Sequence, residues 1–135
     1  MKAFLDTSVL VASFYGDHVH HEASLNLFTR FDRKEACCAA HSLFEVYSVL
    51  TRMPGKHRVS GEQAMLFIGS VRERLTLIAL TAEEYAKTQQ TFADLCVTGG
   101  AIYDAHLAAC ALKARAAAAL PPESLTRPHL RSPTG

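Results

Sequence analysis

The sequence has no tryptophan, little excess charge and no long hydrophobic run. A formal net charge of +1 excludes a protein that coats nucleic acid through bulk positive charge. No stretch approaches the length of a membrane-spanning helix, so a membrane protein is not expected. The apolar run after Lys2 is broken by Asp6, which does not fit a secretory signal. We therefore expect a cytoplasmic protein.

Cysteine occurs four times, and its spacing excludes two common classes of small protein. Cys37 and Cys38 are adjacent, whereas zinc and redox sites typically use a C-x-x-C spacing. Cys96 and Cys110 are isolated from them and from each other. Four scattered cysteines in an apolar-rich chain predict buried thiols of a cytosolic protein rather than a disulfide framework.

Proline is scarce until the end of the chain, where four of the five prolines follow residue 120. The 135 residues suit one domain, with 49% hydrophobic and 20% charged residues as in an ordinary globular protein. We expect this domain over residues 1–120. Residues 121–135 lack hydrophobic periodicity and predict an irregular or disordered tail.

Short apolar runs alternate with segments of helical periodicity along the domain. The expected strands are residues 1–5, 36–40, 75–80 and 116–120, and the expected helices are residues 8–14, 18–31, 42–52, 60–74, 81–96 and 101–115. Ser8 is a candidate helix cap, and Ser60 and Thr81 each begin a capping-box pattern. This alternation predicts an α/β/α sandwich with a short, mostly parallel sheet and helices on both faces.

Three acidic residues occur in unusually apolar surroundings. Asp6 directly follows the first expected strand, and a buried carboxylate is costly unless it is paired or bound to a cation. Glu45 lies between apolar neighbours early in an expected helix, and Asp104 lies in the first turn of an alanine-rich helix. Each of these two also has a purely structural interpretation, Glu45 on the polar stripe of its helix and Asp104 interacting with the helix dipole.

Ligands of open α/β sheets bind at the carboxyl ends of the strands, where all three acids are expected. If the topology brings them together, the carboxylates repel one another unless a cation neutralises them. Mg²⁺ or Mn²⁺ prefers oxygen ligands and is usually held by few carboxylates together with water and phosphate. A divalent-cation site is therefore one hypothesis for Asp6, Glu45 and Asp104.

Three segments, FLDTSVLV, FEVYSVLTRMPG and GGAIYDAHLAACAL, occur in an order and at separations that resemble a PIN domain. The similarity is greatest to the VapC-type ribonuclease toxins of bacterial type II toxin–antitoxin systems, and it spans residues 1–120. It implies a PIN-like three-layer α/β/α sandwich and a Mg²⁺- or Mn²⁺-dependent endoribonuclease. It also implies a homodimer, a cognate VapB-like antitoxin, and an RNA substrate such as tRNA or rRNA.

The resemblance assigns roles to individual residues. Asp6, Glu45 and Asp104 match the acids that form the metal site and carry catalysis in the family. Thr7 or Ser8 matches a supporting hydroxyl.

The end of the domain departs from the family pattern. Members usually have a further Asp or Asn after the last strand, followed by an aromatic residue, whereas this chain has Leu120, two prolines and Glu123. Glu123 is the candidate fourth acid. The alternative is a catalytically weakened PIN fold that binds antitoxin or RNA without cutting it.

The only local basic patch contains Arg52, Lys56 and Arg58. It is either a solvated loop or a set of contacts to RNA phosphates. A third hypothesis treats Asp6 as the nucleophile of an unrelated phosphoryl-transfer enzyme. Ser8 argues against it, because haloacid-dehalogenase enzymes need a second Asp at that position.

Overall fold

The computed structural model describes residues 2–118, which form an α/β fold with a parallel sheet. In chain order the elements are β1 (Ala3–Phe4), α1 (Thr7–Phe14), α2 (His21–Arg30), β2 (Ala36–Ala39), α3 (His41–Arg52), the 3₁₀ turn η1 (Gly55–His57), α4 (Gly61–Arg74), β3 (Thr76–Ile78), α5 (Ala82–Asp94) and α6 (Ala101–Ala118). The expected α/β sandwich is confirmed. None of these helices is both long enough and apolar enough to cross a membrane.

The sheet has the strand order β1-β2-β3, with both pairs parallel. Phe4 pairs with Cys37, and Cys37 pairs with Thr76, which places the three short strands side by side. All four residues of β2 are fully buried. A central parallel strand must be covered on both faces, which explains why its sequence is continuously apolar rather than alternating.

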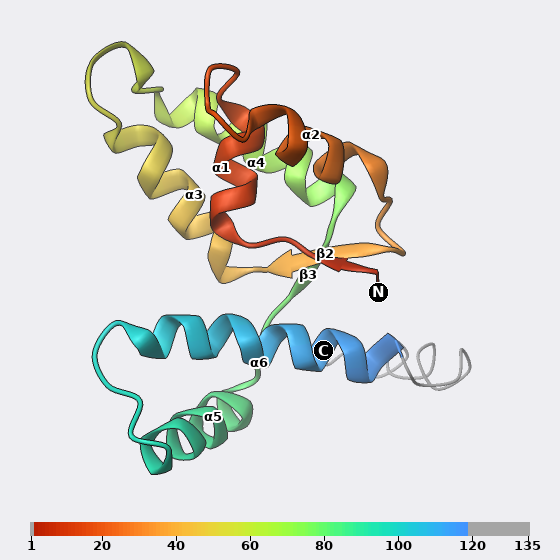
Figure 1. Cartoon of the computed structure of the whole chain (residues 1–135), viewed down its shortest axis with the longest axis vertical. Helices are drawn as coiled ribbons and strands as arrows, with labels where there is room; N and C mark the ends of the chain where they lie inside the picture. Colours follow the sequence, from red (N-terminus) through yellow and green to blue (C-terminus); the bar gives the residue numbers. More distant parts are fainter. Residues whose placement is uncertain (1, 119–135) are drawn as a thin grey trace.

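Helices cover both faces of this sheet (Figure 1). Helices α1 to α4 lie on one side, and α5 and α6 lie on the other. The larger core packs between the sheet and the first group, and its fully buried large side chains include Leu10, Val46, Leu50, Val71 and Leu75. A smaller core joins α6 to the sheet through Ala39, Leu80 and Cys110. The three layers follow from the requirement that each apolar stripe be buried.

Both predicted capping boxes are confirmed. Ser60 and Thr81 each accept a hydrogen bond from the backbone N–H three residues on, and the Gln63 and Glu84 side chains bond back to the backbone N–H of their cap. These reciprocal bonds satisfy backbone donors that the first turn of a helix otherwise leaves free. The sequence therefore fixes where α4 and α5 begin.

The structure corrects three local expectations. Residues 116–118 continue α6 instead of forming a strand, because alanine is the strongest helix former and nothing in that run is β-branched. The cap of α1 is Asp6, not Ser8. Cys96 is exposed at a positive φ of 61°, whereas the other three cysteines are buried free thiols as predicted. Residues 119–120 and the predicted tail at 121–135 lie outside the described residues.

Candidate active site

Asp6 lies where β1 ends and α1 begins. Its backbone is extended, and one carboxylate oxygen accepts hydrogen bonds from the Val9 N–H at 3.1 Å and the Ser8 hydroxyl at 2.8 Å. A carboxylate at this position also interacts favourably with the helix dipole. The side chain is exposed, although Leu5 before it is buried. Because the Asp6 carboxylate is exposed, it avoids the desolvation penalty that a buried carboxylate would incur. The hydrogen bonds from Ser8 and Val9 hold it in place.

Thr7 connects the first motif to the second. Its hydroxyl donates a hydrogen bond of 2.7 Å to Oε1 of Glu45, which is 38 residues away in the sequence. Glu45 is half-buried on the second turn of α3, and α1 and α3 pack against each other. The segment that carries Asp6 is thereby joined directly to the second predicted acid.

Asp104 lies in the first turn of α6, with an exposed side chain. Helix α6 packs on β2 and β3 from the opposite face of the sheet, and Figure 1 shows its first turns toward the same edge of the sheet as the starts of α1 and α3. All three predicted acids thus come from elements that begin at the carboxyl ends of the strands. This is the edge at which parallel α/β sheets bind their ligands.

Two histidines connect α3 to α6 near these acids. The rings of His41 and His106 meet edge to face, with centroids 5.3 Å apart. Burial lowers the pKa of His106, the neighbouring His41 lowers it further, and the charge of Glu45 partly offsets both effects. His106 is therefore held in its neutral form near neutral pH, and Glu45 is close enough for its charge to act on the ring.

The donor set suits a hard divalent cation in kind, because it consists of carboxylate oxygens with a supporting hydroxyl. Among residues 2–118, however, no group of three or more His, Cys, Asp or Glu side chains is spaced to hold a metal ion. Asp6 and Glu45 are linked because Thr7, the residue after Asp6, donates a hydrogen bond to Glu45. Asp104 shares only the same edge of the sheet. The histidines at positions 18, 20 and 21 form no metal-binding group either.

The remaining predicted residues lie away from the acids or outside the residues that the structure describes. Arg52 ends α3, seven residues beyond Glu45, which is about 10 Å at a rise of about 1.5 Å per residue. Lys56 is exposed in η1, and the Arg58 side chain donates to the Met53 carbonyl at 3.0 Å. The basic patch is therefore at the end of α3 that points away from the sheet (Figure 1). Glu123 lies outside the described residues.

Sequence reasoning missed His41 and Tyr85 as neighbours of the site. His41 had one usable signal, since it precedes Glu45 by four residues and so shares its helix face. Tyr85 had none, because its contact with His106 joins α5 to α6 and depends on how those helices pack.

A parallel sheet with helices on both faces and acids at the carboxyl ends of its strands defines a three-layer α/β fold with an acidic edge. Residues 3–119 match the model of the PIN domain family. The chain is 38% identical to Ribonuclease VapC40 of Mycobacterium tuberculosis over 100 residues, which is 74% of this chain and 71% of that protein. It is 34% identical to Ribonuclease VapC27 of the same organism, over 83% of this chain and 78% of the relative.

A solved structure agrees with the fold. The crystal structure of Mycobacterium tuberculosis VapC20, described as a Sarcin-Ricin loop cleaving toxin, superposes with a TM-score of 0.64 at 17% identity. The superposition covers 84% of each chain. The chain therefore belongs to the PIN domain family, and its relatives within that family are VapC-type ribonucleases.

Proposed function

We propose that this protein is a VapC-type toxin, an endoribonuclease that hydrolyses RNA phosphodiester bonds with Mg²⁺ or Mn²⁺ at Asp6, Glu45 and Asp104. The observation that carries the proposal is the hydrogen bond from Thr7 to Glu45, which joins two of the three acidic motifs at one sheet edge. The PIN domain family, and relatives that are named ribonucleases, support the nuclease assignment.

A metal site built from these acids does not need three ligands in contact before substrate binds. Mg²⁺ keeps several waters and is commonly held by one or two carboxylates together with substrate phosphate. The oxygen of Asp6 that is not bonded to Ser8 or Val9 makes no hydrogen bond within residues 2–118. Asp6 and Glu45 therefore supply the first ligands in the proposal, and Asp104 completes the set from α6.

The chain's own residues would act by positioning. Ser8 and the Val9 N–H fix one oxygen of Asp6, and Thr7 fixes one oxygen of Glu45, so neither carboxylate must be ordered when RNA binds. The chemistry supplied by a bound divalent cation is polarisation of a phosphoryl oxygen, activation of water and stabilisation of the leaving oxygen. The carboxylates need not accept the proton themselves.

The partners in the proposal follow from the family. They are an RNA substrate, with tRNA and rRNA as the first candidates, a VapB-like antitoxin that blocks the acidic edge, and a second copy of the chain in a homodimer. RNA binding at the acidic edge requires a cation in this proposal, because carboxylates alone repel the phosphates of RNA.

A second candidate function is a weakened PIN fold that binds RNA or antitoxin without cutting. It is favoured by one observation, that residues 2–118 do not gather three acids into a ready coordination group. The two candidates differ in whether the purified protein binds Mn²⁺ and cuts RNA.

The experiment that tests the proposal is Mn²⁺ binding by calorimetry, with cleavage of labelled total tRNA and rRNA in the same buffer. Wild type should bind and cut, and Asp6→Asn should do neither. Asp94→Asn is the matched control, because Asp94 is an exposed acid on α5 bonded only to Gln90 within the described chain. Wild type that binds antitoxin but neither binds Mn²⁺ nor cuts RNA would establish the second candidate.

A further inference from the structure

A cavity of about 250 Å³ lies between the start of α3 and the helices α5 and α6. Its lining includes four rings and two polar side chains: His41, Tyr85, Tyr103, His106, Thr88 and Gln89. This volume is below the roughly 300–1,000 Å³ of pockets for drug-sized ligands, so the cavity suits a single small ring system. No Asp, Glu, Lys or Arg lines it, which favours an uncharged ligand over a phosphate.

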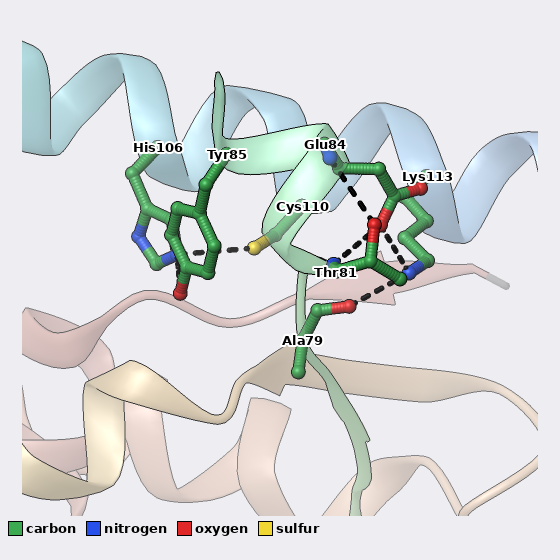
Figure 2. Close-up of polar contacts among 7 residues, drawn as sticks. All are labelled: Ala79, Thr81, Glu84, Tyr85, His106, Cys110 and Lys113. Carbon is green, nitrogen blue, oxygen red and sulfur yellow. Dashed lines mark hydrogen bonds and ion pairs between the residues drawn. The ribbon is translucent and has the colours of Figure 1, made fainter. Parts of the chain in front are cut away.

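Two of the rings form a fixed stack. Tyr85 and His106 are nearly parallel, with an interplanar angle of 8° and centroids 5.6 Å apart. Figure 2 shows the two rings facing each other, with the Cys110 sulfur beside the imidazole; the Sγ–Nε2 distance is 3.5 Å. His41 meets the same imidazole edge to face. The rings are therefore held in place by contacts from three helices before any ligand binds.

The tyrosines leave aromatic surface open to solvent. Tyr103 is 60% exposed and Tyr85 is 43% exposed, although both rings line the cavity. Within residues 2–118, Tyr103 makes no ring–ring contact with another aromatic side chain. Exposed aromatic rings are the surfaces on which proteins stack unpaired RNA bases.

Polar groups lie beside these rings. Thr88 and Gln89 are consecutive on α5, and neither side chain makes a hydrogen bond within the part of the chain that the structure describes. An amide offers both a donor and an acceptor, as does a hydroxyl, so the pair can bond to the edge of a heterocyclic base.

The cavity adjoins the acidic edge. His41 precedes Glu45 by one helical turn on the same face of α3, and Tyr103 directly precedes Asp104 on α6. A nucleotide whose phosphate lies at the acids therefore has its neighbouring base within reach of the cavity.

We propose that this cavity binds one unpaired nucleobase of the RNA substrate, stacked on Tyr85 and Tyr103 and bonded at its edge by Gln89 or Thr88. The inference rests on the proposed function, because it takes the ligand to be the RNA whose phosphate meets Asp6, Glu45 and Asp104. Base stacking is tolerant of sequence, so the cavity positions the strand, and the polar pair adds a preference among bases.

The test asks whether removing a base from the RNA and removing the tyrosine rings from the cavity affect the same interaction. It uses a fluorescein-labelled, unstructured ten-nucleotide RNA and a series of variants of this RNA, each with one abasic nucleotide. Anisotropy titrations are run with Ca²⁺ in place of Mn²⁺, so that the acids hold an oxygen-preferring cation, and a gel of the same samples confirms that the RNA stays intact. For wild type, one abasic position should weaken binding about 5- to 100-fold, the range expected for one stacked base. For Tyr85→Leu with Tyr103→Leu, the intact RNA should bind weakly and that abasic position should cost nothing more.

Matched variants separate the cavity from general effects. Tyr47→Leu changes a tyrosine of similar exposure, 40%, that does not line the cavity, and it should keep the abasic penalty. Tyr85→Phe keeps the ring and should keep the penalty as well. Gln89→Ala alters an exposed side chain, so it should change stability by less than about 0.5 kcal/mol, and it should change which base binds best.

The outcomes distinguish the cavity from the nuclease. Equal abasic penalties in wild type and in the double tyrosine variant, or no RNA binding by wild type, would overturn the base site. Cleavage in Mn²⁺ is measured separately with the same protein preparations. Cleavage with no loss of affinity at any single abasic position would support the nuclease and reject the base site. A loss of affinity at one abasic position without cleavage would support a PIN fold that binds RNA but does not cut it.

Discussion

At the scale of single residues, Thr7 has the most specific role in the proposed site. Thr7 follows Asp6 directly and begins α1. Its hydroxyl donates a hydrogen bond across the α1–α3 contact to Glu45 on α3. Hydrogen bonds to a charged group stabilise more than neutral ones, and half-burial of Glu45 reduces competition from water. The hydroxyl thus fixes a carboxylate that neither α1 nor α3 positions alone.

Replacing Thr7 with valine should therefore lower RNA cleavage while the fold is kept. The two side chains have the same shape, but valine cannot donate, so we expect a loss of about 1.5–3 kcal/mol in the ordering of Glu45, or about 10- to 160-fold in kcat/KM. Steady-state cleavage and a urea melt measure the two effects. Thr51→Val is the control, because that hydroxyl bonds only to a backbone carbonyl of its own helix. Equal activity of both variants would contradict the role of Thr7.

At the scale of secondary-structure elements, α5 and α6 are tied together by one ion pair. Lys113 on α6 donates to Oε1 of Glu84 at 2.7 Å and to the Ala79 carbonyl at 2.7 Å (Figure 2). Glu84 is also the residue that closes the capping box of α5. The same carboxylate thus begins one helix and anchors another, near the cavity wall that Tyr85 forms.

This arrangement predicts a pH-dependent stability. The hydrogen bond from Lys113, and next the backbone N–H of Thr81, lower the pKa of Glu84. A lowered folded-state pKa stabilises the protein above the unfolded-state pKa of about 4.3, and this contribution is lost as the pH falls through the folded-state pKa.

Glu84→Gln should therefore be less stable than wild type at pH 7, and the difference should shrink as the pH falls below about 4.3, the unfolded-state pKa. The difference at pH 7 should not exceed about 1 kcal/mol, because both side chains are more than a third exposed. Urea unfolding at pH 7, 5 and 3 measures it. Glu83→Gln, at the exposed neighbouring position, should show no such trend. A difference that persists unchanged to pH 3 would argue against the ion pair as its cause.

At the scale of the whole molecule, most of the buried apolar side chains of residues 2–118 belong to the core that α1, α3 and α4 form against the sheet. Leu50 is fully buried in it, whereas Leu66 on α4 is 77% exposed. Close-packed interiors respond to the loss of even a few methylene groups, while exposed positions do not.

Leu50→Ala should destabilise the protein by about 2–5 kcal/mol through lost burial and the cavity left behind, and Leu66→Ala by less than about 0.5 kcal/mol. Denaturant midpoints of the two variants measure the contrast, with the slope of unfolding as a check that the transition stays cooperative. Similar losses at both positions would mean that the exposed face of α4 is covered in solution.

The sequence by itself determined the order of the elements and the identity of the acids. Capping boxes, alternating apolar runs and the three motifs depend on neighbours within a few residues, so they can be read before folding. The same local logic failed for residues 116–118, where a terminal apolar run suits either a strand or a helix and alanine decides for the helix.

Only the tertiary structure decided what meets at the sheet edge. The bond from Thr7 to Glu45, the contact of His41 with His106 and the stack of Tyr85 on His106 each join elements that are distant in the sequence. No local pattern encodes them, because they depend on how helices pack across the sheet. The sequence named the acids of this PIN domain, and the packing of α3, α5 and α6 placed an aromatic cavity beside them.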